Sequence, residues 1–190
     1  MPRLIGLYSP APGSGKTAIA SYLSTNGFTR VPMAATIKKM VVVLLCDLGV
    51  SADDASRLVY TDKHEEIPGI KASARHLLQT LGTEYGRGCV HPDVWLMCWR
   101  TSVQEHIRAG MHVVCDDVRF PNEANLLREL GGELWMVTRP GVKRTDTHVS
   151  EGGLDNFPYF DRRLCNAGSL PDLYRRVARV IEIGTLHPTS

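Results

Sequence analysis

The segment that most constrains the fold of this chain is a glycine-rich turn between an apolar run and a helix-forming run. The apolar run is RLIGLY at residues 3–8, the turn is SPAPGSGKT at residues 9–17, and apolar residues then recur at helical spacing up to residue 23. Backbone N–H groups in such a turn and in the first helical turn bind an anion, and the helix dipole assists them. We therefore predict a strand, a phosphate-binding loop and a helix, in this order.

Two prolines lie within the turn. Pro10 stands where the pattern G-x-x-x-x-G-K-[ST] has its first glycine, and Pro12 follows it. Proline lacks an N–H and fixes φ, but both prolines precede the groups that bind the anion. We expect them to stiffen the loop and to leave its binding capacity intact. The residues predicted to hold the nucleotide phosphates are Gly13, Ser14, Gly15, Lys16 and Thr17.

The composition is that of a globular protein with balanced charge. A chain of 190 residues with 43% hydrophobic content can bury a sizeable core, and we predict a single domain over residues 1–190. The formal net charge is +2 with both signs interspersed, so the basic stripe of a duplex-binding protein is missing and we expect no nucleic-acid polymer as a partner. The longest apolar run, residues 40–46, is too short to cross a membrane, and no apolar signal segment precedes the first strand. We expect a cytoplasmic protein without a membrane partner.

The cysteines indicate neither a disulfide framework nor a metal site. There are five of them, an odd number, without C-x-x-C spacing, and four have apolar neighbours. We expect reduced, buried thiols. Asp146, His148 and Glu151 are spaced too loosely to predict a zinc site.

Apolar runs that resemble strands alternate with helical patterns, which is typical of a parallel sheet covered by helices. We therefore predict the α/β class with three α/β/α layers. Two polar segments, residues 60–71 and 139–161, lack regular patterning, and long loops of this kind often cover substrates. The predicted strands are residues 3–8, 28–31, 111–115, 133–138 and a short piece at 164–165. Beyond the helix after the turn, the predicted helices are residues 35–48, 73–81 and 92–109 and those that begin at 121 and 169.

Metal-assisted phosphate chemistry is indicated by the turn together with a pair of acids. Lys16 should reach the β- and γ-phosphates, and the Thr17 hydroxyl should bind Mg²⁺. The apolar strand at 111–115 runs directly into Asp116 and Asp117, which provides a rigid carboxylate beside the phosphates. The spacing alone leaves open which of the two acids serves Mg²⁺.

Phosphoryl transfer also requires positive charge around the transferred oxygens and in-line positioning. Arg75 and Gln79 are four residues apart and share a helix face. Of Trp95 and Trp99, at least one is expected in the core, and Trp95 is kept as a candidate for contact with a base. Each cation alone is typical of a solvated surface, but their grouping near the acids and in the polar segments favours a site. The remaining candidates are Arg87, Arg119, Arg139, Lys143 and Arg144.

Several longer motifs then make a family resemblance visible. The chain resembles the bacteriophage deoxynucleoside monophosphate kinases, which are P-loop relatives of the adenylate kinase group. The resemblance covers nearly the whole chain in order, and its first and third motifs are far more specific than the phosphate loop. The motifs are RHLLQTLGTE at 75–84, PDVW at 92–95, DDVRFPNEA at 116–124, HVSE at 148–151 and NAGSL at 166–170.

The resemblance implies a P-loop NTPase fold and transfer of the ATP γ-phosphate to a deoxynucleoside 5′-monophosphate, with Mg²⁺, in the cytoplasm of an infected cell. It implies a monophosphate-binding region at about 33–100 that includes Lys38, a lid at about 139–161 with Arg139 and Arg144 as catalytic residues, and Asn166 near the adenine. Asp117 would be the acid of the D-V-R-F motif. The resemblance also implies that the partners of the protein are small nucleotides.

Other functions stay open at this point. A kinase for another small acceptor, such as a modified pyrimidine monophosphate or dephospho-coenzyme A, would share the loop and the carboxylates. A nucleotide-binding ATPase that transfers nothing would share them too. No guanine-reading N-K-x-D motif occurs, which weakens a GTPase. The preferred base and a homodimer are also left open.

Overall fold

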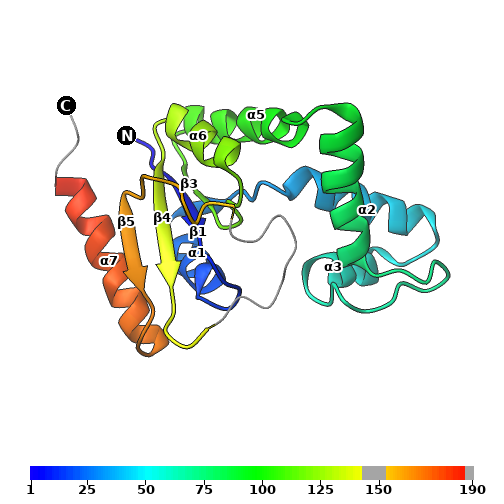
Figure 1. Ribbon diagram of the computed structural model, residues 1–190, viewed down its shortest axis with the longest axis horizontal. Helices are drawn as coiled ribbons and strands as arrows, with labels where there is room; N and C mark the ends of the chain where they lie inside the picture. Colours follow the sequence, from blue (N-terminus) through cyan, green and yellow to red (C-terminus); the bar gives the residue numbers. More distant parts are fainter. Residues whose placement is uncertain (143–152, 187–190) are drawn as a thin grey trace. The chain divides into compact units, whose positions relative to one another are not determined.

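The computed structural model describes residues 1–142 and 153–186. Within it the chain forms two compact units (Figure 1). Met1–Pro32 and Val103–Ser190 make up the first, which we call the sheet unit, and Met33–Ser102 make up the second, the helical insert. The bounds of the insert are close to the predicted monophosphate-binding region at 33–100. The prediction of a single domain stays a prediction.

The sheet unit contains five parallel strands in the order β2-β3-β1-β4-β5 (Figure 1). All five predicted strands are confirmed, with bounds within two residues of those expected. Because the strands are parallel, their carboxyl ends share one edge of the sheet. The strands are β1 (Leu4–Tyr8), β2 (Phe28–Arg30), β3 (His112–Cys115), β4 (Glu133–Thr138) and β5 (Arg162–Cys165).

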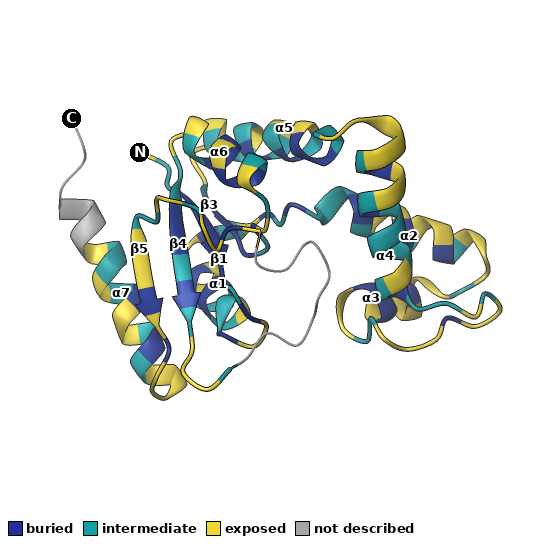
Figure 2. Ribbon diagram, viewed as in Figure 1, coloured by how far each residue is buried: buried dark blue, intermediate teal, exposed yellow. Residues whose placement is uncertain are grey.

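Helices cover both faces of this sheet, so the predicted three-layer α/β/α architecture is confirmed. On one face, Ile5 of β1 packs in a common core with Ile19 of α1 (Lys16–Thr25) and Val177 of α7 (Leu170–Leu186). On the other face, a Cβ at Gly6 would lie 2.7 Å from the side chain of Leu127 in α6 (Pro121–Glu129). Figure 2 shows the central strands β1 and β4 largely buried and the edge strand β5 mostly exposed.

Part of the predicted lid at 139–161 is packed against β1. Leu154 is fully buried, and the Tyr8 hydroxyl donates to an oxygen of Asp155 at 2.5 Å. The Tyr8 ring also stacks on Phe160, with 5.7 Å between centroids. The end of this segment is therefore fixed to the strand that precedes the phosphate loop. Residues 143–152, which include Lys143, Arg144 and the loosely spaced Asp146, His148 and Glu151, lie outside the described residues.

The helical insert consists of α2 (Ala35–Asp47), α3 (Ala52–Tyr60), α4 (Ala74–Gln79), the π-helix η1 (Thr80–Val90) and the first part of α5 (Val94–Arg108). Val41, Leu45, Leu58 and Ile67 are buried in its core. The helix predicted at 35–48 is confirmed, whereas α3 was not predicted. The predicted helix end at Gly82 is wrong, because the chain continues to Val90 in wider π-helical turns.

The π-helix packs closely against the indole ring of Trp95 at Gly82 and Gly86. The indole N–H of Trp95 donates to the carbonyl of Gly82 at 2.7 Å, and a Cβ at Gly86 would lie only 2.3 Å from the ring. A regular α-helix keeps its carbonyls for its own N–H groups, whereas here one of them is shared with the ring. Glycine at both positions lets the backbone approach Trp95, so these glycines serve packing and do not end the helix.

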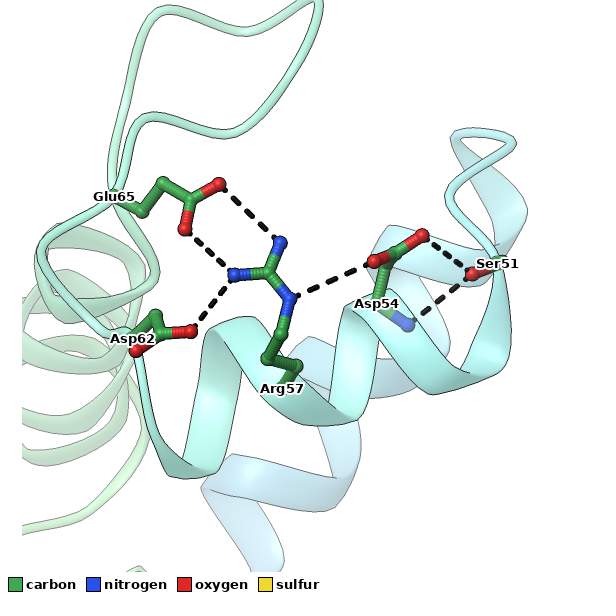
Figure 3. Close-up of polar contacts among 5 residues, drawn as sticks. All are labelled: Ser51, Asp54, Arg57, Asp62 and Glu65. Atoms are coloured by element: carbon green, nitrogen blue, oxygen red, sulfur yellow. Dashed lines mark hydrogen bonds and ion pairs between the residues drawn. The ribbon is translucent and has the colours of Figure 1, made fainter.

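Charged residues hold the beginning of the polar segment at 60–71 (Figure 3). Arg57 donates to Asp62 at 2.8 Å and to Glu65 at 2.7 Å, and its Nε lies 3.6 Å from a carboxylate oxygen of Asp54. The backbone N–H of Asp54 in turn donates to the hydroxyl of Ser51. The hydrogen bond from Arg57 lowers the pKa of Glu65. These groups are exposed, so each pair contributes little to stability.

The remainder of this segment is anchored by burial. Ile67 is fully buried, and its N–H donates to the carbonyl of Ala72 at 2.8 Å. The N–H of Arg75 donates to the carbonyl of Lys63 at 2.8 Å. Burying an isoleucine contributes roughly 1.5–3 kcal/mol, more than the exposed pairs. The segment thus lacks regular structure, as predicted, yet is attached to α4; its role as a substrate cover stays a prediction.

Two further expectations concern membranes and cysteines. No helix in residues 1–142 or 153–186 is long and apolar enough to cross a bilayer. Cys115 is buried, but Cys89 and Cys165 are exposed, so the prediction of buried thiols is wrong for these two. Cys165 lies on the edge strand β5 and Cys89 near the end of η1, where apolar neighbours in sequence do not ensure cover.

Candidate functional site

The groups predicted to act on phosphates or to lie near the adenine follow four strands whose carboxyl ends share one edge of the sheet. The glycine-rich loop follows β1, Asp116 and Asp117 follow β3, Arg139 follows β4 and Asn166 follows β5. In open α/β sheets, ligands bind outside the carboxyl ends where the strand order reverses. The order reverses at β1. After β1 the chain forms β2 at one edge of the sheet and returns to β3 beside β1, and it then crosses to β4 and β5 on the other side of β1.

The loop presents an uncapped helix N-terminus. Gly13 and Gly15 adopt positive φ angles of 73° and 110°, and Lys16 begins α1 directly after them. Among residues 1–142 and 153–186, no side chain caps α1 at Gly15, and the first turn of α1 contains no acid. Within the described part of the chain, no hydrogen bond uses the backbone N–H of Gly13, Gly15 or Thr17. These N–H groups are the donors that an anion at a helix N-terminus requires.

The carbonyls of the same loop are held from inside the protein. The hydroxyls of Ser9 and Ser14 both donate to the carbonyl of Ala11, at 2.5 and 2.7 Å. The side-chain amide of Asn166 donates to the carbonyl of Ser14 at 3.1 Å. Ser9, Ser14 and Asn166 are all buried. The loop is therefore braced internally with Pro10 in place.

The two acids after β3 have different partners. Asp116 is only 7% exposed, and the guanidinium of Arg30 grips it with both branches: Nε donates to Oδ1 at 2.9 Å, and Nη2 donates to Oδ2. Burial alone would lower the pKa of Arg30, but its bond to Asp116 and the charges of Asp116 and Asp117 raise it. Asp116 is thus neutralised by a bidentate ion pair. Arg30 was not predicted; it ends β2, which pairs with β3.

Asp117 lies half-buried beside the thiol of Cys115. The Cys115 sulfur donates to Oδ1 of Asp117 at 3.3 Å. Complete burial and the charge of Asp117 raise the pKa of Cys115, so the thiol stays protonated and remains a donor. The oxygens of Thr17 and Asp117 are the hard ligands that Mg²⁺ prefers, so this donor set fits the predicted ion. Cys115 was not predicted as part of the site.

The predicted cations of the sheet unit lie at the surface. Arg119 is exposed, and its backbone N–H donates to Glu123 at 2.7 Å, just before α6 begins. Arg139 is exposed immediately after β4. Arg144 is outside the described residues. The exposed position of Arg139 leaves its side chain accessible to a ligand.

The predicted acceptor-binding residues lie in the helical insert. Arg75 and Gln79 are half-buried at the two ends of α4, and Arg87 is half-buried on η1. The ammonium of Lys38 on α2 lies 5.4 Å from the centre of the Tyr60 ring. Like α1, α2 has no acid in its first turn, whereas Ser51 caps α3 and Ser73 caps α4.

Trp95 differs from these polar candidates. It is 8% exposed, and its indole N–H is occupied by Gly82. The described contacts of Trp95 are those of a core residue. Contact with a base stays a prediction.

Comparison with known proteins points to one family. Residues 50–177 match the family model described as deoxynucleotide monophosphate kinase. The chain is 31% identical to a protein of Acanthamoeba polyphaga mimivirus that carries the same family name, over 94% of this chain and 96% of that protein. It is 29% identical to the deoxynucleotide monophosphate kinase of Enterobacteria phage T4, over 58% of this chain and 46% of the phage protein. The chain thus spans about half of the phage enzyme.

A solved structure shares the fold. Dephospho-CoA kinase from Campylobacter jejuni superposes with a TM-score of 0.50 over 95% of this chain and 96% of that one, at 12% sequence identity. At this identity the likeness concerns the fold alone. It agrees with the predicted P-loop kinase architecture.

Proposed function

The chain belongs to the deoxynucleotide monophosphate kinase family, and we propose that it transfers the γ-phosphate of ATP to a deoxynucleoside 5′-monophosphate, giving ADP and the diphosphate. The observation that carries the proposal in the structure is the braced glycine-rich loop. Its carbonyls are held inside the protein, and the N–H groups of Gly13, Gly15 and Thr17 are left to bind phosphate.

The donor side of the reaction falls to residues of the sheet unit. The Lys16 ammonium contacts the β- and γ-phosphates and follows the charge that develops as the γ-phosphoryl group moves. Thr17 and Asp117 hold Mg²⁺, which when bound neutralises phosphate charge. Asp116 is assigned a structural role, because both of its oxygens already accept from Arg30. Arg139 and Arg144 supply further charge from the lid and help to exclude water.

The acceptor side falls mainly to the helical insert. The N-terminus of α2, whose first turn contains no acid, supports binding of the acceptor phosphate there, with Lys38 one turn further on. Arg75 and Gln79 share one face of α4, where a guanidinium fork and an amide can grip the same nucleotide. Arg87 and Arg119 add positive charge, and Trp95 keeps its predicted contact with the base.

An acceptor screen tests the proposal. Purified protein is incubated with ATP and Mg²⁺ and with each deoxy- and ribonucleoside monophosphate in turn, while ADP and the new diphosphate are measured. We expect ADP release only with an accepted monophosphate, in equal amount to the diphosphate. Transfer to dephospho-coenzyme A or only to a modified pyrimidine monophosphate would replace the proposed acceptor. ADP release independent of any acceptor would indicate an ATPase instead.

Arg75→Ala should raise the KM for the acceptor by about 10- to 100-fold, because a hydrogen bond to a charged group contributes roughly 1.5–3 kcal/mol. The KM for ATP should change little, and kcat should fall because a loosely held acceptor is seldom in line. Steady-state kinetics with both substrates varied measures this. The control is Arg108→Ala, an exposed arginine at the end of α5. Unchanged acceptor KM and kcat would reject the proposed binding of the acceptor by Arg75. A defect confined to ATP would assign Arg75 to the donor side instead.

Pro10→Gly should change ATP affinity by less than about tenfold, or about 1.4 kcal/mol. The reason is that the donors of the loop lie after the proline and the carbonyl of Ala11 is already fixed by two serines. Calorimetric titration of both proteins with ATP measures the difference. A much larger gain in affinity on restoring glycine would show that Pro10 impairs the loop.

A further inference from the structure

The side chain of Asn166 lies directly behind the phosphate-binding loop. It is 5% exposed, and its amide nitrogen donates to the carbonyl of Ser14 at 3.1 Å. A Cβ at Gly15 would lie 2.7 Å from the same nitrogen. Asn166 thus contacts both residues of the peptide that joins Ser14 to Gly15, although 152 positions separate it from Ser14 in the sequence.

This contact determines where the peptide N–H points. A trans peptide is planar, and its C=O and N–H bonds point in opposite directions. Asn166 holds the Ser14 carbonyl on the inner side of the loop, so the N–H of Gly15 faces the outer side. Within the described residues, that N–H donates no hydrogen bond. It is therefore directed where the proposed function requires a phosphate oxygen.

Asn166 is itself rigidly held. Its backbone N–H donates to the carbonyl of Thr138 at 2.7 Å, which extends the pairing of β4 and β5 by one residue. After Asn166, a cap formed by Ser169 and Asp172 fixes the start of α7. The Ser169 N–H and hydroxyl both donate to the carboxylate of Asp172, at 3.0 and 2.6 Å. These bonds with Ser169 lower the pKa of Asp172 to about 2, so the carboxylate that accepts them stays ionised well into the acid range. A fixed backbone on both sides lets the Asn166 amide impose its orientation on the loop.

We propose that Asn166 is a positioning residue, whose amide orients the Ser14–Gly15 peptide so that the Gly15 N–H binds the polyphosphate of the donor nucleotide. The inference rests on the proposed function, because it needs a polyphosphate in the loop. It differs from a contact between Asn166 and adenine in one measurable way. A brace of the loop strengthens binding of the phosphates whatever base they carry, whereas an adenine contact depends on the base.

The test compares ligands with and without a base. Binding of ATP, GTP and inorganic tripolyphosphate, each with Mg²⁺, is measured by calorimetry for the wild type, Asn166→Ala and Asn166→Asp. Asn166→Asp keeps the side-chain volume but places an ionised acceptor against a carbonyl, so it answers the question if the alanine variant does not fold. Melting curves establish which variants are folded. The matched control is Asn26→Ala, since the Asn26 amide also donates to a backbone carbonyl, that of Tyr22 at 2.7 Å, but at the far end of α1.

We expect each Asn166 variant to weaken binding of all three ligands by the same factor, about 10- to 100-fold for the loss of the hydrogen bond from the Gly15 N–H to a charged phosphate, while Asn26→Ala leaves binding unchanged. The KM for the acceptor should not move. Weakening of ATP alone, with normal tripolyphosphate binding, would overturn the inference in favour of an adenine contact, and unchanged binding of all ligands would also overturn it. If the wild type binds neither ATP nor tripolyphosphate, the proposed function fails first.

Discussion

Lys16→Ala should lower turnover by about 100-fold or more with both substrates saturating. One preorganised charged group that follows the transferred phosphoryl is commonly worth about 3–4 kcal/mol of transition-state stabilisation. Lys16 is the first residue of α1 and follows directly on the positive-φ Gly15, so its backbone is fixed at the helix N-terminus where the phosphates are expected. The change is measured as kcat from ADP formation with the accepted monophosphate.

A matched control separates loss of this group from a general loss of positive charge. Lys39→Ala removes an exposed lysine from α2 and should leave kcat near that of the wild type. Melting temperatures of both variants should stay close to the wild-type value, because neither lysine lies in a core. Near-normal transfer by Lys16→Ala would reject the assignment of Lys16 and, with it, the reading of SPAPGSGKT as the phosphate loop.

The sheet could be predicted because its signals are local. Each strand is a short apolar run, and all five residues of β1 are buried, as expected of a strand covered on both faces. The helix α3 also has local signals, although it was not predicted. Ser51 caps it, Asp53 and Asp54 lie in its first turn, and Ala55, Leu58 and Val59 form its buried face. The capping serine and the acids after it are the sequence signals that predict this helix.

The π-helix could not be predicted in the same way. From the sequence, Gly82 predicts a helix end, because a glycine that follows a periodic segment usually ends the helix. Its actual role depends on Trp95, thirteen residues later, which takes the Gly82 carbonyl and needs the space beside Gly86. Tertiary packing overrides the local signal here.

The site residues that belong to motifs could be predicted from the sequence, whereas the side chains that contact them could not. Lys16, Thr17, Asp117 and Asn166 are all in recognisable motifs. Arg30 and Cys115 carry no motif. Cys115 contacts Asp117 two residues further along the chain, whereas the contact of Arg30 with Asp116 depends on β2 and β3 being neighbours in the sheet. For the same reason the two acids could not be told apart by spacing. Their different partners distinguish them and lead to opposite expectations for their replacement.

Asp117→Asn and Asp116→Asn should therefore have different effects. Asp117→Asn replaces a proposed Mg²⁺ ligand by a neutral one, so we expect kcat to fall by about 100-fold or more, since one electrostatic contribution of this kind is worth about 3–4 kcal/mol. The Mg²⁺ concentration for half-maximal activity should rise, while the melting temperature changes little. Asp116→Asn leaves Arg30 without its counter-charge. Its main effect should be a loss of stability of about 1–3 kcal/mol, reduced below that of a fully buried pair because Arg30 is partly exposed.

The two readouts decide the assignment together, and a third variant checks the cause. Activity per folded molecule and the Mg²⁺ requirement of Asp116→Asn should remain close to those of the wild type. In Arg30→Met combined with Asp116→Asn, neither charge is left unpaired, so the double variant should lose less stability than the sum of the single changes. If Asp116→Asn instead raises the Mg²⁺ requirement and Asp117→Asn does not, the metal ligand is Asp116. Equal loss of activity in both variants at unchanged stability would mean that the ion pair with Arg30 does not keep Asp116 from the metal.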